Sequence, residues 1–303
     1  MKRTVSLVDY ASSDSEQDEP TTQPPPAKGS SPPPTKKPRK LPALSAALLP
    51  QVPVDNPALH QGRKRTAAHV EGQWAAHVYV PLVVNRRSKL FKLLVRIYSS
   101  AKQLVPSLHP IGLTDADLSP PSSAGPEPPD NTIELHISLT RPTYLRAHQR
   151  DEFKRAVHAL ARTRASFPAS FAAVSELTND ERTRTFLALE LGAGHDELRG
   201  LSDGLKPTLQ SLRQHEFYEK PRFHASIAWA LLDGSSPPGD GQCSEDVDAQ
   251  NCDFVTIPSF PPSLVPQLQR EFCGELVKPG VGTFEADELH VRIGKEVTKW
   301  KLQ

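Results

Sequence analysis

The stretch FHASIAWAL, residues 223–231, places a histidine and a serine two residues apart inside an otherwise apolar run. Side chains of a β-strand alternate between its two faces, so His224 and Ser226 share one face. Ile227 and Trp229 share the other face, which has the composition of a protein core. The first face is free to present an imidazole and a hydroxyl to a bound anion.

A second pair of this kind occurs in TIELHISLT, residues 132–140, where His136 and Ser138 again share one face. Histidine followed by serine at this spacing is common by chance, so the bare motif has no weight. What has weight is its position, because each pair lies in the middle of an alternating strand and on the second strand of its half of the chain. Alone, a histidine in an apolar strand is more often a hydrogen-bonded core residue than a catalyst.

Hydrophobic periodicity predicts the same order of elements, β-α-β-α-β, in both halves. Pro207 should bend or split the third helix. The expected strands are 74–80, 132–140, near 170–175, 184–191, 222–231, near 281–293 and 296–302, and the expected helices are 89–105, 151–164, 196–213 and near 262–276. The repeated order indicates a duplication that forms two lobes with a cleft between them. The predicted class is therefore α+β, with a pseudo-two-fold axis that sets the two histidine-serine faces opposite each other.

Proline-rich segments divide the chain of 303 residues. Twelve of the 31 prolines fall within residues 1–65 and seven within 101–130. These segments have few aromatic residues and cannot bury enough apolar surface to offset the entropy of ordering. We therefore expect a disordered tail over 1–69, a bilobal domain over 70–303, and disordered insertions at 106–130 and 233–253.

Basic clusters in the tail predict a nuclear protein. The tail carries two basic clusters, KKPRK (residues 36–40) and GRKR (residues 62–65), of the kind that import receptors bind. The interpretation as a nuclear address competes with that of a solvated charge run. The first twenty residues lack a secretory signal and no run is long enough to span a membrane, so we expect a soluble intracellular chain. The three cysteines, without CxxC spacing, are expected to be free thiols. The residues predicted to contact an import receptor are Lys36, Lys37, Arg39 and Lys40.

Two imidazoles and two hydroxyls suit cleavage of a phosphodiester without a metal. One histidine can act as general base and the other as general acid near neutral pH, and the serine hydroxyls can donate hydrogen bonds to phosphate oxygens. With RNA, the base would deprotonate the ribose 2′-OH and the acid would protonate the leaving 5′-oxygen. The sequence offers no carboxylate cluster or cysteine-histidine set for a metal, so no cofactor is expected.

Paired H-x-S strands in a duplicated chain resemble the two-histidine (2H) phosphoesterases. Within that superfamily the chain is similar to the U6 snRNA phosphodiesterase family, through GQWAAHVYVP (72–81), HISL (136–139), TNDERTRTFLALEL (178–191) and FYEKPRFHASIAWAL (217–231). The resemblance implies a 3′-to-5′ exoribonuclease that trims the oligouridine 3′ end of U6 snRNA in the nucleus and leaves a 2′,3′-cyclic phosphate or a 3′-phosphate. It also implies a partner RNA and a protein that acts as a monomer.

The same resemblance assigns residues. It implies catalysis by His136 and His224, with Ser138 and Ser226 on the phosphate. Tyr218 falls where the family stacks an aromatic ring on a terminal base, although it could also simply cap the core. The remaining implied contact is Asp180, in a substrate-contacting loop, where this chain differs from the family residue. His77, which has no such support, is expected to be structural.

Two other functions stay open at the level of sequence. The first is a 2H enzyme that acts on small cyclic phosphates, which a compact cleft without Tyr218 would favour. The second is a non-catalytic RNA-binding or spliceosome-associated protein that uses its tail. Cleavage assays with RNA and with small cyclic phosphates separate the three.

Overall fold

The computed structural model describes residues 56–63, 70–118, 131–233 and 254–303, all within the unit Gln51–Gln303. The basic cluster at 36–40, and with it the predicted import contacts, lies outside these residues. The strands are β1 (Gln73–Asn85), β2 (His109–Pro110), β3 (Thr132–Ser138), β4 (Thr143–Arg146), β5 (Phe167–Thr178), β6 (Arg184–Leu191), β7 (His224–Leu232), β8 (Thr256–Ile257), β9 (Thr283–Ala286), β10 (Glu288–Ile293) and β11 (Glu296–Lys301).

The α-helices are α1 (Lys89–Leu104), α2 (Asp115–Leu118), α3 (Arg150–Ala161), α4 (His195–Ser211), α5 (Leu264–Leu268) and α6 (Gly274–Leu276). A π-helical segment, Gln269–Cys273, joins α5 to α6, and short 3-10 turns occupy Pro57–His60 and Ala147–Gln149. Among the described residues, none of these helices has the length and apolar character needed to cross a bilayer. Cys273 is a free thiol, and the other two cysteines lie outside the described residues.

The main sheet has the order β11-β10-β1-β3-β7-β6-β5-β9, and its two halves are related by a pseudo-two-fold axis. Reversing the central order β10-β1-β3-β7-β6-β5 exchanges β1 with β6, β3 with β7 and β10 with β5. The first half of the sequence therefore gives its last strand, β5, to the other half of the sheet, and the second half gives its last two, β10 and β11. We call the side of β11, β10, β1 and β3 lobe 1, and the side of β7, β6, β5 and β9 lobe 2. The predicted α+β class and duplicated β-α-β-α-β order are confirmed.

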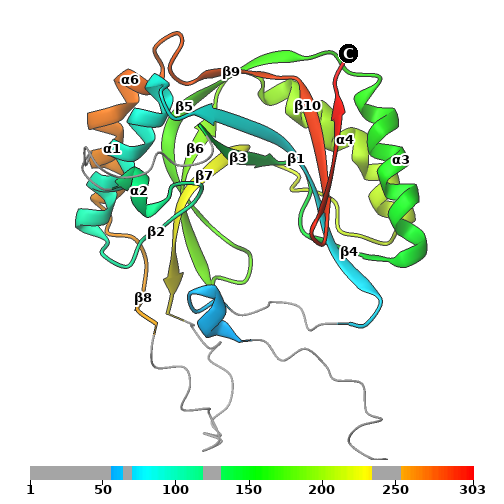
Figure 1. Ribbon diagram of the computed structural model, residues 1–303, viewed down its shortest axis with the longest axis horizontal. Helices are drawn as coiled ribbons and strands as arrows, with labels where there is room; N and C mark the ends of the chain where they lie inside the picture. The colour runs from blue at the N-terminus through cyan, green and yellow to red at the C-terminus, as the bar shows by residue number, and fades with distance from the viewer. Residues whose placement is uncertain (1–55, 64–69, 119–130, 234–253) are drawn as a thin grey trace, which may run out of the picture. The chain divides into compact units, whose positions relative to one another are not determined.

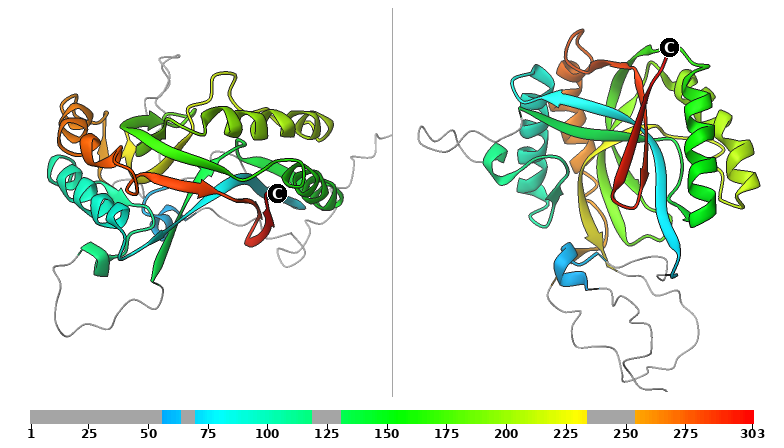
Figure 2. Two further views of the ribbon diagram at one scale, coloured as in Figure 1. Left: turned by 90° about the horizontal axis from the view of Figure 1, so that it is seen from above. Right: turned by 45° about the vertical axis from the view of Figure 1, so that its right-hand side comes forward.

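Helices cover one face of the sheet and leave the other face of β3 and β7 open. Helix α3 packs against α4, β10 and β11 in lobe 1, while α1 packs against α5 and α6 beside β5 and β7 in lobe 2 (Figures 1 and 2). In β3 the apolar side chains of Ile133, Leu135 and Ile137 are buried toward the helices. The alternate positions, His136 among them, point to the uncovered face.

The proline-rich insertion is shorter than expected. Residues 106–118 are folded, because Leu108 and Leu113 are buried and His109 pairs with Trp229 of β7. The expectation of disorder over 106–130 is therefore wrong for this part, and 119–130 lies outside the described residues. The high proline content predicted disorder, but two buried leucines attach the segment to the core.

The tail boundary at residue 69 also differs from the structure. Residues 56–63 are described, and Asn56 caps the 3-10 turn by accepting a hydrogen bond from the backbone N–H of Ala58, at 3.0 Å. Arg63 lies 5.3 Å from the centroid of the Trp229 ring. Contact with an aromatic side chain of β7 thus extends the folded part of the chain into the proline-rich segment.

Helix α4 is continuous through Pro207, so the expected split is absent. Leu205 and Leu209 are buried on either side of the proline and hold both parts of the helix against the core. That packing outweighs the backbone hydrogen bond that proline cannot make. The expected strand at 281–293 is two strands, β9 and β10, which join different lobes.

Ile137 is the residue of β3 that pairs with β7, and its side chain is fully buried. We expect Ile137→Ala to lower the free energy of unfolding by about 2–5 kcal/mol, the usual cost of such a cavity. Urea unfolding followed by circular dichroism measures the change. Val83→Ala, at an exposed position of the adjacent strand β1, is the matched control and should change the free energy by less than about 0.5 kcal/mol. Equal effects of the two substitutions would contradict the role of Ile137 in the core.

Candidate active site

The two lobes meet where β3 pairs with β7, in antiparallel register at Ile137 and Ala225. On this register His136 lies across from Ser226, and Ser138 lies across from His224. All four side chains extend from the uncovered face, because they are one residue away from the buried pair on each strand. The structure therefore brings the four predicted residues together in one cluster.

His224 presents a defined nitrogen to this cluster. Its Nδ1–H donates a hydrogen bond of 2.6 Å to the backbone carbonyl of Arg222. A carbonyl only accepts, so this contact fixes the tautomer and leaves Nε2 as the nitrogen available for proton transfer. Burial lowers the pKa of His224, and the hydrogen bond to the Arg222 carbonyl partly opposes that shift.

His136 is surrounded by aromatic rings of lobe 1. Its ring centroid lies 5.6 Å from that of Tyr79 and 5.8 Å from that of His77, both edge-on. Burial lowers the pKa of His136, and the nearby charge of His224 lowers it further. Glu134, two residues earlier on the same face, acts in the opposite direction. Mutual repulsion disfavours the doubly protonated pair, and burial disfavours protonation of either ring.

The hydroxyls of Ser138 and Ser226 make no hydrogen bond to other described residues, and both side chains are half-buried. They remain available to an anion between the two imidazoles. A pocket of about 320 Å³ adjoins them and draws its walls from both lobes. Its lining comprises Ser138, Thr140, Arg141, Pro142, Leu177, Thr178, Asn179, Asp180, Phe186, Phe217, Tyr218, Lys220, Arg222 and His224.

Tyr218 and Asp180 form one wall of this pocket together with Arg141. The phenol hydroxyl of Tyr218 donates to the Asp180 carboxylate at 3.1 Å. The guanidinium of Arg141 lies 4.1 Å from the centroid of the Tyr218 ring and pairs with Asp180 at 3.2 Å. The pKa of Tyr218 is raised by burial and then by Asp180. Asp180 therefore orients Tyr218 and Arg141, a role that the sequence resemblance did not indicate.

Arg222 enters the pocket wall but is already paired. It forms a two-point contact with the Glu190 carboxylate, with Nε–Oε1 at 3.0 Å and Nη2–Oε2 at 2.6 Å. The hydrogen bond from Arg222 lowers the pKa of Glu190. This ion pair fixes the chain segment whose carbonyl orients His224, and so links Glu190 of β6 to the geometry of the site.

A polar network adjoins His136 in lobe 1. The Tyr79 hydroxyl donates to Glu134 at 3.3 Å, and burial followed by Glu134 raises the pKa of Tyr79 to about 12. His290 is fully buried, and its Nε2–H donates to Glu288 at 2.9 Å. Its Nδ1 makes no hydrogen bond among the described residues and lies 3.9 Å from the Glu134 carboxylate. Burial lowers the pKa of His77 to about 4, with further lowering by His136 and Arg292.

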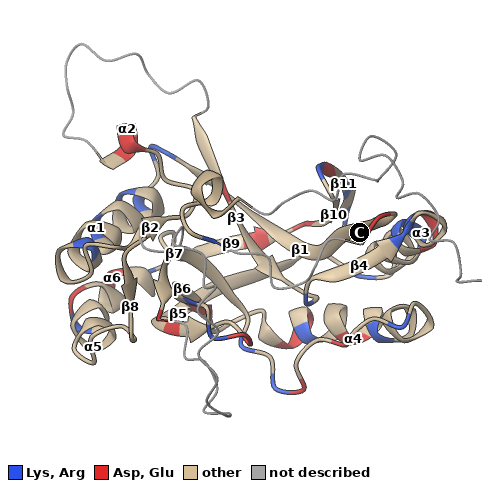
Figure 3. Cartoon of the chain, turned by 90° about the horizontal axis from the view of Figure 1, so that it is seen from below, with Lys and Arg blue, Asp and Glu red and all other residues tan. Residues whose placement is uncertain are grey.

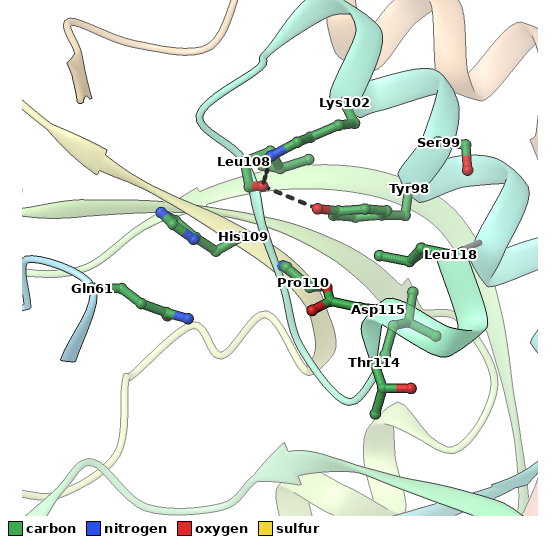
Figure 4. A pocket seen from close by; sticks show the side chains of 11 residues that line it. Gln61, Tyr98, Ser99, Lys102, Leu108, His109, Pro110, Thr114, Asp115 and Leu118 are labelled. Atoms are coloured by element: carbon green, nitrogen blue, oxygen red, sulfur yellow. Dashed lines mark hydrogen bonds between the residues drawn. The ribbon is translucent and has the colours of Figure 1, made fainter. Parts of the chain in front are cut away.

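A larger cavity, of about 730 Å³, lies between α1, α2 and the segment around β2 (Figure 4). Lys102 Nζ and the Tyr98 hydroxyl both donate to the carbonyl of Leu108, at 2.7 and 3.0 Å. His109 stacks on Trp229, with ring centroids 4.6 Å apart. The polar side chains of this cavity thus mainly anchor the segment 106–118, and the paired imidazoles lie elsewhere.

Trp229 is buried, but not on the face that strand alternation predicted. A register shift at Leu187 and Ala188 pairs Trp229 with Phe186, which lines the pocket, so Trp229 lies on the same face as Phe186. Trp74 packs against the core. Among the described residues no group of three or more histidine, cysteine, aspartate or glutamate side chains has the spacing of a metal site. Sequence reasoning missed Arg141 and Glu190, because they contact the site only through a loop and a neighbouring strand. Glu134 and Tyr79 could have been predicted from the sequence, because each lies two residues from a histidine and therefore shares its face of the strand.

His77 makes the fold sensitive to acid. Its pKa is about 4 in the folded chain, against about 6.5 for an unperturbed histidine, so the unfolded chain binds its proton more readily between these values. Stability contributed by neutral His77 is complete above about pH 6.5 and is lost as the pH falls toward 4. We expect His77→Gln to reduce the stability difference between pH 7 and pH 5 by about 1–2 kcal/mol. Urea unfolding at both pH values checks this, with exposed His148→Gln as control. An unchanged difference in His77→Gln would contradict the assignment.

Comparison with known proteins shows which family the chain belongs to. U6 snRNA phosphodiesterase 1 of Drosophila melanogaster is 29% identical over 239 residues, covering 76% of this chain and 83% of the relative. The Homo sapiens protein of the same name is 30% identical over 200 residues, covering 65% of each. Usb1 of Kluyveromyces marxianus, solved with uridine monophosphate, aligns with 15% identity and a TM-score of 0.47, covering 77% of this chain and 99% of Usb1.

Escherichia coli LigT, solved with 3′-AMP, aligns with 12% identity and a TM-score of 0.38, covering 76% of this chain and 99% of LigT. The family model described as "HVSL: Uncharacterised conserved protein" matches residues 33–301, which is most of the chain and includes both histidine-serine strands. The chain belongs to the HVSL family and resembles the U6 snRNA phosphodiesterases.

Proposed function

We propose that this protein is a metal-independent 3′-to-5′ exoribonuclease that trims the oligouridine 3′ end of U6 snRNA. The observation that carries the proposal is the register at Ile137 and Ala225, which sets His136 and His224 on one open face with two unengaged serine hydroxyls. Relatives named U6 snRNA phosphodiesterase 1 supply the substrate class. A nuclear location follows from that substrate.

Cleavage proceeds by attack of the ribose 2′-oxygen on the adjacent phosphorus. One imidazole removes the 2′-OH proton as the new P–O bond forms, and the other donates a proton to the 5′-oxygen as its bond to phosphorus breaks. The first cleavage leaves a 2′,3′-cyclic phosphate on the shortened RNA and releases the terminal nucleoside with a 5′-OH. Each later cleavage releases a nucleotide that carries the phosphate left by the previous one. Attack by water on the cyclic phosphate, with the same two groups, would give a 3′-phosphate.

The serine hydroxyls and the lowered histidine pKa values fit this chemistry. Ser138 and Ser226 donate to the non-bridging oxygens, where negative charge increases in the transition state. A bound phosphate adds negative charge beside the two imidazoles, and so favours a protonated imidazole beside a neutral one. The fixed Nδ1–H of His224 keeps its Nε2 directed away from the Arg222 carbonyl.

The pocket beside His224 accommodates the last nucleoside. A volume of about 320 Å³ is of the size that holds one small ligand, and its walls include the apolar side chains of Leu177 and Phe186. A terminal base stacks on the face of Tyr218 opposite Arg141. A pocket that takes one base favours removal of nucleotides from an end.

The proposal is tested by incubating a 3′-oligouridine RNA with the protein in excess EDTA and analysing the new ends by mass. Shortening should persist, with cyclic phosphate or 3′-phosphate ends. His136→Ala and His224→Ala should each lower the rate by about 10²–10⁴-fold, the usual contribution of a general acid or base. His158→Ala, on the outer helix α3 where the ring stacks on Trp300, is the control and should retain wild-type activity.

Abolition by EDTA, or near-full activity without either His136 or His224, would reject this mechanism. Turnover of small cyclic phosphates in preference to RNA would favour the small-substrate enzyme. RNA binding by wild-type protein and both histidine variants, with no cleavage under any condition, would favour a binding protein.

Tyr218 is tested by comparing two substitutions. Tyr218→Ala removes the stacking surface and should raise KM for oligouridine by about 5- to 150-fold, corresponding to about 1–3 kcal/mol per stacked base. Tyr218→Phe keeps the ring and loses only the hydrogen bond to Asp180, so its KM should lie much closer to the wild-type value. If the two variants raise KM equally, the ring does not stack on a base.

A further inference from the structure

The face of the sheet that carries the two serines continues onto β1 and β10 of lobe 1. Tyr79 of β1 pairs with Ser138 of β3, and His290 of β10 pairs with Tyr79. Two residues further along β1, His77 pairs with Arg292 of β10. Paired residues share a face, so these side chains lie on the same side of the sheet as the catalytic cluster. Tyr79 and His290 are buried there, whereas His77 is half-buried and Arg292 is exposed.

The pseudo-two-fold axis gives this surface a counterpart in lobe 2. Just as Tyr79 lies across from Ser138, Ala188 of β6 lies across from Ser226. The pair His77 and Arg292 therefore corresponds to Phe186 and Leu177, which pair between β6 and β5. Phe186 and Leu177 line the pocket assigned to the terminal base. The symmetry-related positions are thus apolar in lobe 2, and cationic and hydrogen-bonding in lobe 1.

Arg292 is available to a ligand. It is exposed and forms no hydrogen bond or ion pair with the described residues. Arg222, at the other side of the site, is instead held by Glu190. Arg292 lies across from His77 in the strand register, and its positive charge lowers the pKa of both His77 and His136.

Positive charge continues from Arg292 onto β11. Lys299 pairs with His290 and Lys301 with Glu288, and both lysines are exposed without an ion pair among the described residues. Of the two carboxylates on this face, Glu288 accepts a hydrogen bond from His290, and Glu134 accepts one from Tyr79. Both basic and acidic segments are therefore present on the β10–β11 hairpin, which lies at the edge of the sheet (Figure 3).

We propose that Arg292, with His77 beside it, binds the phosphate on the 5′ side of the nucleotide that precedes the terminal one, and that Lys299 continues this track along the RNA. The inference rests on the proposed function and adds where the body of the RNA lies. With the terminal base in the lobe 2 pocket, the strand leaves the catalytic cluster on the lobe 1 side. A guanidinium is well suited to two-point recognition of a phosphate.

The test compares two substrates, with and without this phosphate, in wild-type protein and in Arg292→Ala, as in a double-mutant cycle. The dinucleotide UpU lacks the phosphate in question, and pUpU restores it. In wild-type protein pUpU should have a KM about tenfold lower than UpU, as one charge-assisted phosphate contact predicts. In Arg292→Ala this advantage should fall to less than about twofold. Because the two substrates share the scissile bond, a general loss of activity cancels in the ratio.

Arg155→Ala, an exposed arginine on the outer helix α3, is the matched control for loss of one positive charge and should keep the tenfold ratio. A tenfold ratio retained in Arg292→Ala would overturn the proposal. So would a ratio lost instead in Arg63→Ala, because Arg63 lies over Trp229 in lobe 2 and would mark a different path.

A binding measurement distinguishes failure of this proposal from failure of the proposed function. Equilibrium binding of a 3′-oligouridine tetranucleotide, with a 2′-deoxy sugar at the penultimate position to prevent cleavage, is measured against salt concentration. Arg292→Ala should weaken binding about tenfold and reduce the slope of log K against log salt by about 0.7, the value for one phosphate contact on a single strand. An unchanged slope would overturn the subsite even if wild-type protein cleaves RNA. The reduced slope would support it even if no cleavage is seen.

Discussion

The site depends on one short stretch of backbone pairing, in which Ile137 of β3 meets Ala225 of β7 at the centre of the sheet. Their buried side chains face the helices, so the flanking histidines and serines must face the other way. A slip of one residue in either strand would turn its histidine into the core and an apolar side chain into the cleft. Core packing and catalytic geometry are therefore set by the same register.

The duplication places similar backbones around a phosphate, and the side chains differentiate the two sides. Phe186, Leu177 and Tyr218 of lobe 2 line the pocket in which the proposed function places a base. Lobe 1 provides the polar side chains of His77 and Arg292 at the related position. A symmetric frame suits a phosphate, which presents similar oxygens to both halves. An asymmetric lining suits an RNA end, which has a terminal base on one side and a charged backbone on the other.

Burial and nearby positive charge favour the neutral form of the imidazoles in the free cleft. Burial lowers the pKa of His77, His136 and His224, and positive neighbours add to the effect at each ring. In the proposed mechanism, a phosphate in the cleft adds negative charge and favours protonation of an imidazole. The proposal thus couples substrate binding to formation of the general acid.

Alternation of apolar and polar residues was enough to predict most strands and the shared face of the histidine-serine pairs. It predicted the duplication as well, because the order of elements repeats. It did not predict that β5 and β10 exchange lobes, since pairing partners are set by long-range packing that periodicity does not report. Proline content misled the assignment of 106–118, where Leu108 and Leu113 attach a proline-rich segment to the core.

Within the site, strand alternation located His136 and His224 but not the groups that orient them. The contact of His224 with the Arg222 carbonyl depends on the path of a loop, and the Arg222–Glu190 ion pair joins residues 32 positions apart. Asp180 was expected to contact substrate, whereas its carboxylate holds Tyr218 and Arg141. Such contacts arise from tertiary structure and leave no periodic signal in the sequence.

The most direct test of the central claim is an NMR titration of the C2 protons of His136 and His224, with and without uridine 3′-monophosphate. An anion held between the two rings should raise the pKa of both from values below 6.5, and both resonances should report the same Kd for the nucleotide. A response from one ring alone, or two different Kd values, would show that the imidazoles do not share a phosphate.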